Sequence, residues 1–233
     1  MQHKKHLFFD MDKTIAPARE PMLPEMRELL GALPHDLVIV SGSLVDQIAY
    51  QTQQLPAYYL GVNGNHATTV ENSELWRNPD LSSEEKAEIQ AHIDAICAQL
   101  DHELNNDWHP IEDRGAQITF SPIGNTAPVE HKRTYDPDRE KRERWLRDIP
   151  FSSENIMARI GGSTSIDYIP RDRHKGANVR KLIDDRGWDP EDCVYIGDGL
   201  YPGGNDELVI GVIETVPVAD HHDTFEKLRQ WYA

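Results

Sequence analysis

The chain has 233 residues, of which 38% are hydrophobic and 27% charged, a composition typical of a globular protein with a sizeable core. Its net charge of −16 argues against anionic partners, so we expect no binding to nucleic acid or to anionic membrane surfaces. No apolar run is longer than a strand, and no secretory leader is recognisable. Because Cys97 and Cys193 are too few for a disulfide framework, we expect a cytoplasmic protein with two reduced thiols.

Two aspartates follow the first predicted strand. Residues 7–9 are a short apolar run, and Asp10 and Asp12 stand where that strand would end. In an open α/β sheet, chemistry collects outside the carboxyl ends of the strands. Two like charges this close require a cation, a shared proton or divided roles. Asp10 as a nucleophile beside Mg²⁺, with Asp12 as acid/base, would meet that need; a solvated Asp-X-Asp turn is the alternative.

A possible phosphate site follows the next strand. Residues 14–24 are irregular, with Arg19 as their cation, and residues 24–30 are predicted to form a helix. A buried strand at 37–40 then leads into Ser41 and Gly42, before a helix at 44–53. The Ser41 hydroxyl and the N–H groups of the helix start could bind a phosphate oxygen, or Ser41 could serve as a plain helix cap. A third strand, at 58–62, ends in a predicted tight turn.

The pattern changes after residue 78. We expect a long amphipathic helix over 82–104, a strand at 116–120 and an exposed helix within 137–149. Two further strands, at 155–160 and 165–169, are joined through paired glycines. This mainly antiparallel α+β region differs from its flanks, which indicates a domain inserted into another. The predicted division is a catalytic core formed by residues 1–77 and 171–233, with an inserted domain over residues 78–170.

The α/β pattern resumes at residue 171. Lys175 precedes a predicted helix that runs to about residue 186. A buried strand at 192–197 then delivers Asp198 into a glycine-rich loop that contains Asp206, and a helix closes the chain at 225–232. Phosphoryl transfer needs a nucleophile, an acid, donors for the equatorial oxygens and Mg²⁺, and these strand-end residues could supply all four.

The motifs resemble those of the haloacid dehalogenase superfamily of aspartyl-phosphate enzymes. The matching segments are FFDMDKT, VSGS, the lysine of RDRHKG, and YIGDGLYPGGNDE. The segments ITFSPIG, GGSTSIDYIP and PGGNDE are similar to those of eukaryotic-type phosphomannomutases, which carry a large inserted α+β cap. The resemblance implies a Rossmann-like α/β core with a parallel sheet, together with a cap built on an antiparallel sheet.

The resemblance also implies a role for individual residues. Asp10 would be the nucleophile and Asp12 the acid/base group, while Ser41, Gly42 and Lys175 would hold the transferring phosphoryl group. Mg²⁺ would be bound by Asp10, Asp12, Asp198 and Asp206. The residues implied for substrate binding are Arg19, Arg114, Asn125, Lys132, Arg133, Ser165 and Asp167. The cap would close over the substrate, and a homodimer would form through the cap.

Two departures from the family bear on the reaction. Lys13 and Asn125 stand where phosphomannomutases carry glycine and a phosphate-binding arginine. The lost charged contact, worth roughly 1.5–3 kcal/mol, would favour leakage of the phosphoryl group to water. The resemblance nevertheless implies interconversion of mannose 6-phosphate and mannose 1-phosphate, with a hexose 1,6-bisphosphate as the implied activator. The alternatives are a sugar-phosphate phosphatase of the same superfamily and a catalytically silent sugar-phosphate-binding protein.

Overall fold

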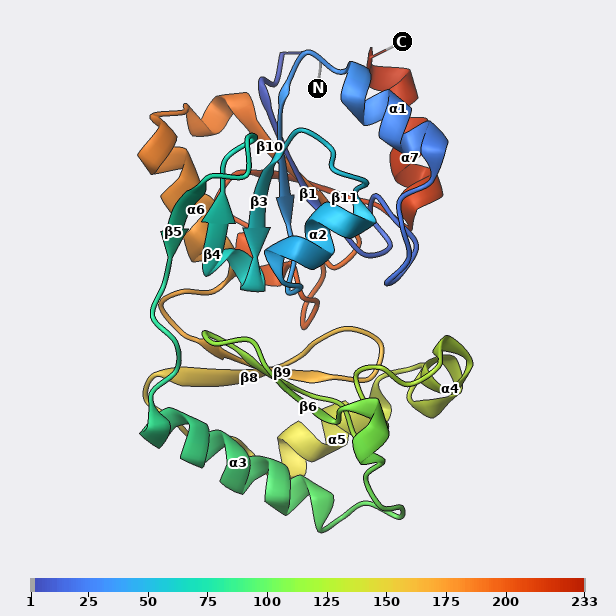
Figure 1. Ribbon diagram of the computed structural model, residues 1–233, viewed down its shortest axis with the longest axis vertical. Coiled ribbons are helices and arrows are strands. Elements are labelled where there is room, and N and C mark those ends of the chain that lie inside the picture. The colour runs from blue at the N-terminus through green and yellow to red at the C-terminus, as the bar shows by residue number, and fades with distance from the viewer. Residues whose placement is uncertain (1–2, 233) are drawn as a thin grey trace. The chain divides into compact units, whose positions relative to one another are not determined.

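The computed structural model describes residues 3–232, and the chain divides into two compact units. The core unit consists of residues 1–78, 173–202 and 206–233, and the cap unit of residues 79–172 and 203–205. Each unit contains one sheet (Figure 1). The predicted fold class, an α/β core with a mainly parallel sheet and an α+β unit with an antiparallel sheet, is confirmed.

The core unit is built on a seven-stranded sheet in the order β11-β10-β1-β2-β3-β4-β5. Its strands are β1 (His6–Asp10), β2 (Asp36–Val40), β3 (Tyr58–Gly61), β4 (His66–Thr68), β5 (Glu74–Arg77), β10 (Cys193–Gly197) and β11 (Glu214–Pro217). The strands from β11 to β3 are parallel, and β4 and β5 extend the sheet antiparallel. Since β1 lies between β10 and β2 and is parallel to both, the carboxyl ends of these three central strands lie next to one another.

Helices cover both faces of this sheet (Figure 1). On one face lie α1 (Pro24–Ala32), α2 (Val45–Gln51) and α7 (His221–Tyr232), and on the other lies α6 (Lys175–Arg186). The first strand shows why two layers are needed: Leu7 and Phe9 belong to one apolar cluster, and Phe8 to the other. Alternating side chains of a central parallel strand point to opposite faces, so both faces must be buried.

The cap unit is a four-stranded antiparallel sheet in the order β6-β7-β9-β8. Its elements are α3 (Ser83–Cys97), β6 (Ile111–Asp113), β7 (Ile118–Phe120), α4 (Val129–Tyr135), α5 (Glu140–Asp148), β8 (Ile156–Ile160) and β9 (Ile166–Pro170). The predicted stripe of α3, Ile89, Ile93 and Ile96, packs with Trp145 of α5 and Phe120 of β7 in one apolar core. Short 3₁₀ segments are η1 (Val62–Gly64), η2 (Asn106–Trp108), η3 (Pro190–Asp192) and η4 (Glu207–Val209).

The predicted helix over 82–104 is too long. Helix α3 starts from a capping box in which the Ser82 hydroxyl accepts from the Glu85 N–H and the Glu85 carboxylate accepts from the Ser82 N–H. It ends at Cys97, yet Leu100 and Leu104 still pack against the cap core. The apolar spacing indicated that Leu100 faces the core, and it does so in partly buried form, but the chain reaches this position through a turn rather than a helix.

Five other helices and strands were not predicted from the sequence. They are β4, β5, β6, β11 and α4. The predicted tight turn after β3 is confirmed: the 3₁₀ segment η1 reverses the chain and leads into β4, which pairs antiparallel with β3. Strands β4 and β5 have only three and four residues, so they are too short to show a clear alternation of apolar and polar side chains.

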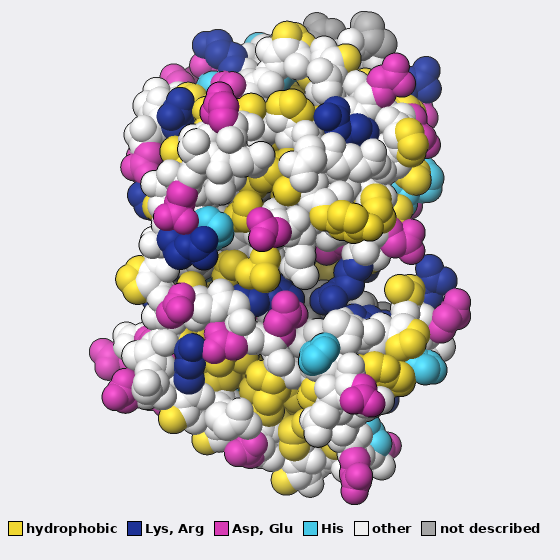
Figure 2. Space-filling model, in the orientation of Figure 1, with side chains coloured by type: hydrophobic (Ala, Val, Ile, Leu, Met, Phe, Trp, Pro, Cys, Tyr) yellow, Lys and Arg dark blue, Asp and Glu magenta, His cyan; other side chains and the backbone are white. Residues whose placement is uncertain are grey.

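The surface agrees with the acidic composition. On the face shown in Figure 2, acidic side chains are spread over both units rather than gathered in one patch. Among residues 3–232, no helix is long and apolar enough to cross a lipid bilayer.

The packing of α7 provides a test of the core. Leu228 is fully buried in the cluster formed with α1 and β1. We expect Leu228→Ala to lower the free energy of unfolding by about 2–5 kcal/mol, because it removes buried methyl groups and leaves a cavity. Arg229→Ala, on the exposed side of the same helix, should change it by less than about 0.5 kcal/mol. Urea denaturation measures both, and equal effects would contradict the assigned packing.

Candidate active site

Three carboxylates and one lysine meet in the core unit, at the carboxyl ends of β1 and β10. Asp10 ends β1, Asp198 follows β10, and Asp206 precedes η4; one carboxylate oxygen from each lies within 4.8 Å of the others. Lys175, the first residue of α6, places Nζ 2.8 Å from an oxygen of Asp10 and 2.6 Å from an oxygen of Asp206. Lys175, Asp10 and Asp206 are buried, so these charges interact away from bulk water.

A glycine permits this approach. A Cβ atom on Gly176 would lie 1.8 Å from the carbonyl oxygen of Leu208, which is closer than any real side chain allows. The first turn of α6 can therefore approach η4 only because residue 176 is glycine. This contact explains why glycine follows Lys175 and brings Lys175 within reach of Asp206.

Hydroxyl groups hold the carboxylates in place. Tyr195 donates a 2.7 Å hydrogen bond to Asp206, and the hydroxyl of Thr14 accepts a 3.0 Å bond from the Asp198 N–H. The same Thr14 hydroxyl lies 3.5 Å from an oxygen of Asp10. Sequence analysis assigned no role to Tyr195 or Thr14. Thr14 belongs to the FFDMDKT motif, and Tyr195 lies three residues before Asp198 on a buried strand, so both carried a signal that could have been used.

The proton affinities reflect crowding of negative charge. Burial and repulsion from Asp206 raise the pKa of Asp10 well above its usual range, although Lys175 acts against this. Burial, followed by the charge of Asp206, raises the pKa of Asp198 to about 6. Burial would lower the pKa of Lys175, but the two carboxylates at its Nζ reverse that effect and raise it. The cluster therefore holds more negative charge than its lysine neutralises.

The donor set fits a divalent cation. Asp10, Asp198 and Asp206 supply carboxylate oxygens within 4.8 Å of one another, and Lys175 forms ion pairs with two of them. Mg²⁺ prefers oxygen ligands and is bound through one or two carboxylates with several waters. A bound cation would relieve the remaining repulsion, so these residues are suited to hold Mg²⁺.

The carboxylate of Asp12 has a separate environment. One of its oxygens accepts a 2.7 Å bond from the Arg19 N–H and a 3.1 Å bond from the Gln51 side chain. It is half-buried and lies outside the three-carboxylate cluster. Gln51 ends α2, is buried, and was not predicted as a site residue. Asp12 is thus held in one orientation by groups from the loop after β1 and from α2.

The backbone of Lys13 adopts a left-handed conformation. Its φ is 64°, in the left-handed region that glycine occupies without strain. A lysine there costs roughly 1–2 kcal/mol. Its charge also opposes the rise in the pKa of Asp198. The substitution therefore adds a cation close to the carboxylates at the expense of local strain.

Ser41 and Gly42 lie directly after β2. Ser41 is buried, and its hydroxyl oxygen accepts a 3.1 Å bond from the Ser43 N–H. The hydroxyl proton remains available for donation to another oxygen. Helix α2 has seven residues and begins only at Val45, so its first N–H groups are a weak reason to expect a phosphate here. The hydroxyl group of Ser41 is the stronger reason, and Ser41 stays a predicted phosphate contact.

The predicted substrate residues of the cap unit differ in exposure. Asn125 is buried, and its amide nitrogen donates to the carbonyl oxygens of His109, Pro110 and Thr119. Lys132 is also buried, with Nζ 2.5 Å from the carbonyl oxygen of Asn125.

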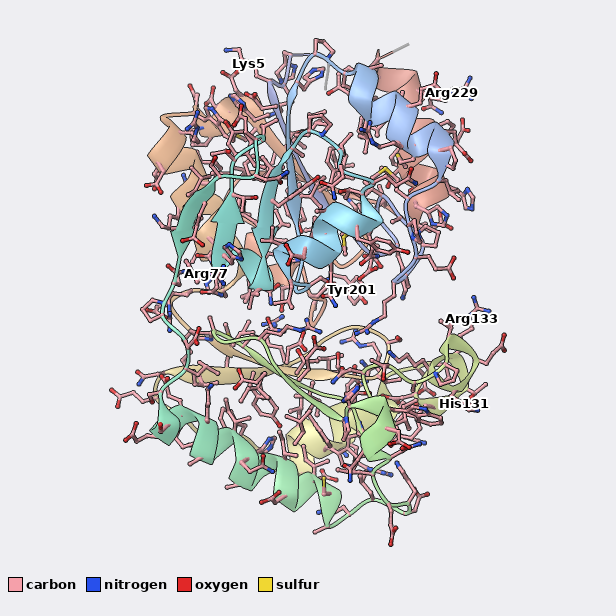
Figure 3. All side chains as sticks on the ribbon, in the orientation of Figure 1. Lys5, Arg77, His131, Arg133, Tyr201 and Arg229 are labelled. Carbon is pink, nitrogen blue, oxygen red and sulfur yellow. The ribbon has the colours of Figure 1, made fainter. Side chains whose placement is uncertain are left out.

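Arginine side chains of the cap unit are placed differently. Arg114 forms a 2.7 Å ion pair with Glu112. Arg133 is exposed and projects from α4 in Figure 3. Substrate contacts by any of the predicted cap residues stay predictions.

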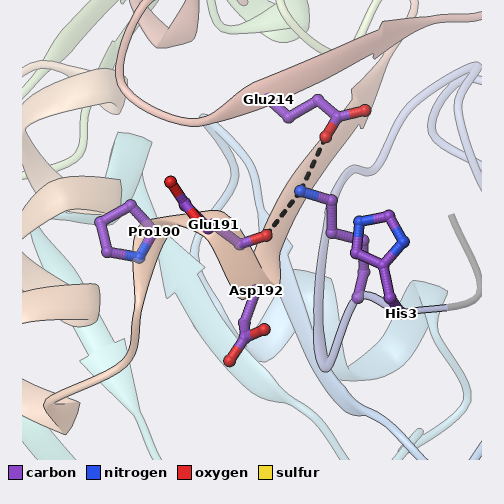
Figure 4. A pocket seen from close by; sticks show the side chains of 6 residues that line it. His3, Pro190, Glu191, Asp192 and Glu214 are labelled. Atoms are coloured by element: carbon purple, nitrogen blue, oxygen red, sulfur yellow. Dashed lines mark hydrogen bonds and ion pairs between the residues drawn. The ribbon is translucent and has the colours of Figure 1, made fainter.

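A pocket lies at the other end of the core strands, away from the carboxylate cluster (Figure 4). It has a volume of about 480 Å³ and is lined by His3, Lys4, Pro190, Glu191, Asp192 and Glu214. The cation there is already bound: Lys4 Nζ lies 2.7 Å from both the Glu214 carboxylate and the Glu191 carbonyl oxygen. These residues precede or begin β1, β10 and β11, whereas chemistry in α/β sheets collects at the carboxyl ends.

Comparisons with known proteins agree with the fold. No family model matches the chain. A probable phosphomannomutase of Caenorhabditis elegans is 26% identical over 90% of this chain and 87% of its own length, and phosphomannomutase 1 of Homo sapiens is 23% identical over 95% and 90%. Among solved structures, an IMP-nucleotidase of Plasmodium falciparum (TM-score 0.72, 14% identity) matches over 98% of this chain and 68% of its own.

A haloacid dehalogenase-like hydrolase from Bacteroides thetaiotaomicron covers 98% of this chain and 100% of its own, with a TM-score of 0.66 and 14% identity. The chain is therefore similar in sequence to phosphomannomutases and shares the fold of a haloacid dehalogenase-like hydrolase. Haloacid dehalogenase enzymes generally use Mg²⁺, and this protein is an enzyme of the phosphotransferase or phosphatase kind.

The charge surplus of the cluster predicts how Mg²⁺ affects stability. Because the pKa of Asp198 is raised to about 6 in the folded protein, the ionised folded state is penalised as pH rises through 6. At about pH 7.5 and Mg²⁺ near 100 times its Kd, we expect Tm to rise by roughly 5–10 °C. At about pH 5 the rise should be smaller, since protons on Asp10 and Asp198 compete with the cation.

Thermal unfolding with and without Mg²⁺ measures this effect. Asp198→Asn should abolish most of the increase in Tm, whereas Asp192→Asn, which removes a carboxylate at the other edge of the sheet, should leave it unchanged. An equal increase at both pH values would contradict a site formed by these carboxylates.

Proposed function

We propose that this enzyme moves a phosphoryl group between positions of a hexose phosphate, as phosphomannomutases do, through a phosphorylated Asp10. The observation that supports this most strongly is the buried Asp10–Lys175–Asp206 contact at the carboxyl end of β1. A carboxylate held next to a lysine is placed to react with a phosphoryl group, whose oxygens the same lysine can bind.

The proposed reaction has two phosphoryl transfers. An oxygen of Asp10 attacks phosphorus of a hexose 1,6-bisphosphate, the bond from phosphorus to the sugar oxygen breaks, and Asp12 protonates that oxygen. A hydroxyl of the resulting monophosphate, or of the substrate, then attacks the phosphorylated Asp10 while Asp12 removes its proton. A bisphosphate that turns round before donating its other phosphoryl group leaves as the isomer of the substrate.

The site residues support these steps electrostatically. Lys175 and Ser41 would hold the oxygens of the transferring group, and Asp12 has its orientation set by Gln51 and the Arg19 N–H. Mg²⁺, bound by Asp10, Asp198 and Asp206, would neutralise charge on the phosphoryl oxygens. We further propose that residues 78–170 form the domain that recognises the sugar.

A phosphatase is the second candidate. Asn125 and Lys132 stand at or near positions where phosphomannomutases have phosphate-binding arginines, and both are engaged inside the cap unit. Weaker retention of a bisphosphate would let water attack the phosphorylated Asp10 instead of a sugar hydroxyl. A hexose bisphosphate would then give a hexose monophosphate and inorganic phosphate, and a hexose monophosphate would give the free sugar and inorganic phosphate.

Removal of the nucleophile tests the shared chemistry. Asp10→Asn should lower kcat on any active hexose phosphate at least roughly 10³-fold, because the amide cannot form the acyl phosphate. Asp36→Asn, which changes a carboxylate at the opposite end of β2, is the matched control and should retain activity. Full turnover by Asp10→Asn would contradict the proposed nucleophile.

Product analysis separates the two reactions. With mannose 1-phosphate, Mg²⁺ and a hexose 1,6-bisphosphate, we expect mannose 6-phosphate to form faster than inorganic phosphate. Release of inorganic phosphate without isomer would support the phosphatase. Affinity for sugar phosphate in calorimetry without turnover would identify a binding protein.

A further inference from the structure

A charged pair lies in the interior of the cap unit. Arg142 of α5 and Asp136, which follows α4, are both buried, and Arg142 Nε lies 2.6 Å from Asp136 Oδ2. The other oxygen of Asp136 accepts a 2.9 Å bond from the Lys141 N–H. The two charges balance each other, unlike those of the cluster around Lys175.

Arg142 also binds the loop between β8 and β9. Its Nη1 donates a 2.6 Å hydrogen bond to the carbonyl oxygen of Gly162 and lies 3.4 Å from that of Ser165. The loop is closed by a 2.9 Å bond from the Gly161 N–H to the same Ser165 carbonyl oxygen. One guanidinium group therefore joins both sides of this loop to α5.

The loop presents two of the residues predicted to bind substrate. A Cβ atom on Gly161 would lie 2.6 Å from Ser165 Oγ and 2.5 Å from an oxygen of Asp167. The two side chains therefore face the same point of the backbone, where only glycine fits. A hydroxyl that can donate and a carboxylate that accepts form a pair suited to the hydroxyl groups of a sugar.

Stability does not explain a buried ion pair at this position. Apolar residues of similar volume usually stabilise a protein core as well as a buried pair does, because burying two charges removes their hydration. The guanidinium group, however, binds carbonyl oxygens in a fixed planar geometry that an apolar residue cannot reproduce. The contacts of Arg142 are directed at the loop that carries Ser165.

We propose that Arg142, oriented by Asp136, is a positioning residue that fixes the 161–165 loop so that Ser165 and Asp167 bind the sugar hydroxyls of the substrate. This rests on the proposed function, since it assumes a hexose phosphate. Arg142 itself touches no substrate; it acts through the backbone of Gly162 and Ser165.

A double-mutant cycle tests the proposal. All proteins carry Asp10→Asn so that no turnover occurs, and calorimetry with Mg²⁺ measures the Kd of mannose 1-phosphate and of inorganic phosphate. We expect Arg142→Lys and Ser165→Ala each to weaken mannose 1-phosphate about tenfold, the loss of roughly one hydrogen bond. Inorganic phosphate, which lacks sugar hydroxyls, should keep its Kd within about twofold. The double variant should bind mannose 1-phosphate with about the same Kd as either single variant, because Arg142 acts through Ser165.

Arg144→Lys is the matched control, since it makes the same change at an exposed position of α5, and it should leave both Kd values unchanged. Additive losses in the combined variant, or equal losses for the two ligands, would overturn the proposal. So would loss of cooperative thermal unfolding in both Arg142→Lys and Arg142→Gln, because Arg142 would then serve the cap fold in general. Failure of the proposed function shows separately, as absent turnover in the protein that retains Asp10.

Discussion

The contact of Lys175 with Asp10 and Asp206 is the interaction on which the rest of the site depends. It joins three segments of the core unit, separated by 165 and 31 residues from Lys175. Without the lysine, the three carboxylates would repel one another in a buried place, and the pKa of Asp10 would rise further. The sheet order sets this meeting, because β1 lies next to β10 and their carboxyl ends open on the same edge.

The protein contains two buried groups of charged side chains, and they differ in net charge. The cluster around Lys175 has a surplus of negative charge, so it is suited to hold a cation. The Arg142–Asp136 pair is balanced and hydrogen-bonded to the backbone, so it offers no site for an ion. The first group is therefore suited to ligand binding, and the second to holding the backbone in one geometry.

The cap unit contains the clearest difference from phosphomannomutases. Where a charged side chain would extend toward a phosphate, Asn125 instead binds three carbonyl oxygens, and Lys132 binds the Asn125 carbonyl oxygen. This network fixes the segment between β7 and α4. It also removes a source of positive charge, and retention of a bisphosphate depends on such charge. In the proposed reaction, the balance between transfer to sugar and transfer to water would therefore rest on cap residues rather than on the core cluster.

The sequence by itself determined the α/β core, the α+β middle region and the strands that carry Asp10 and Asp198, because apolar periodicity and motif spacing are local properties. It did not determine where α3 ends, that β4, β5, β6, β11 and α4 form, or that Thr14, Tyr195 and Gln51 support the carboxylates. It also left open whether Asn125 and Lys132 extend outward or bind each other. Those features depend on which distant backbone and side-chain groups meet after folding, and only the tertiary structure decides that.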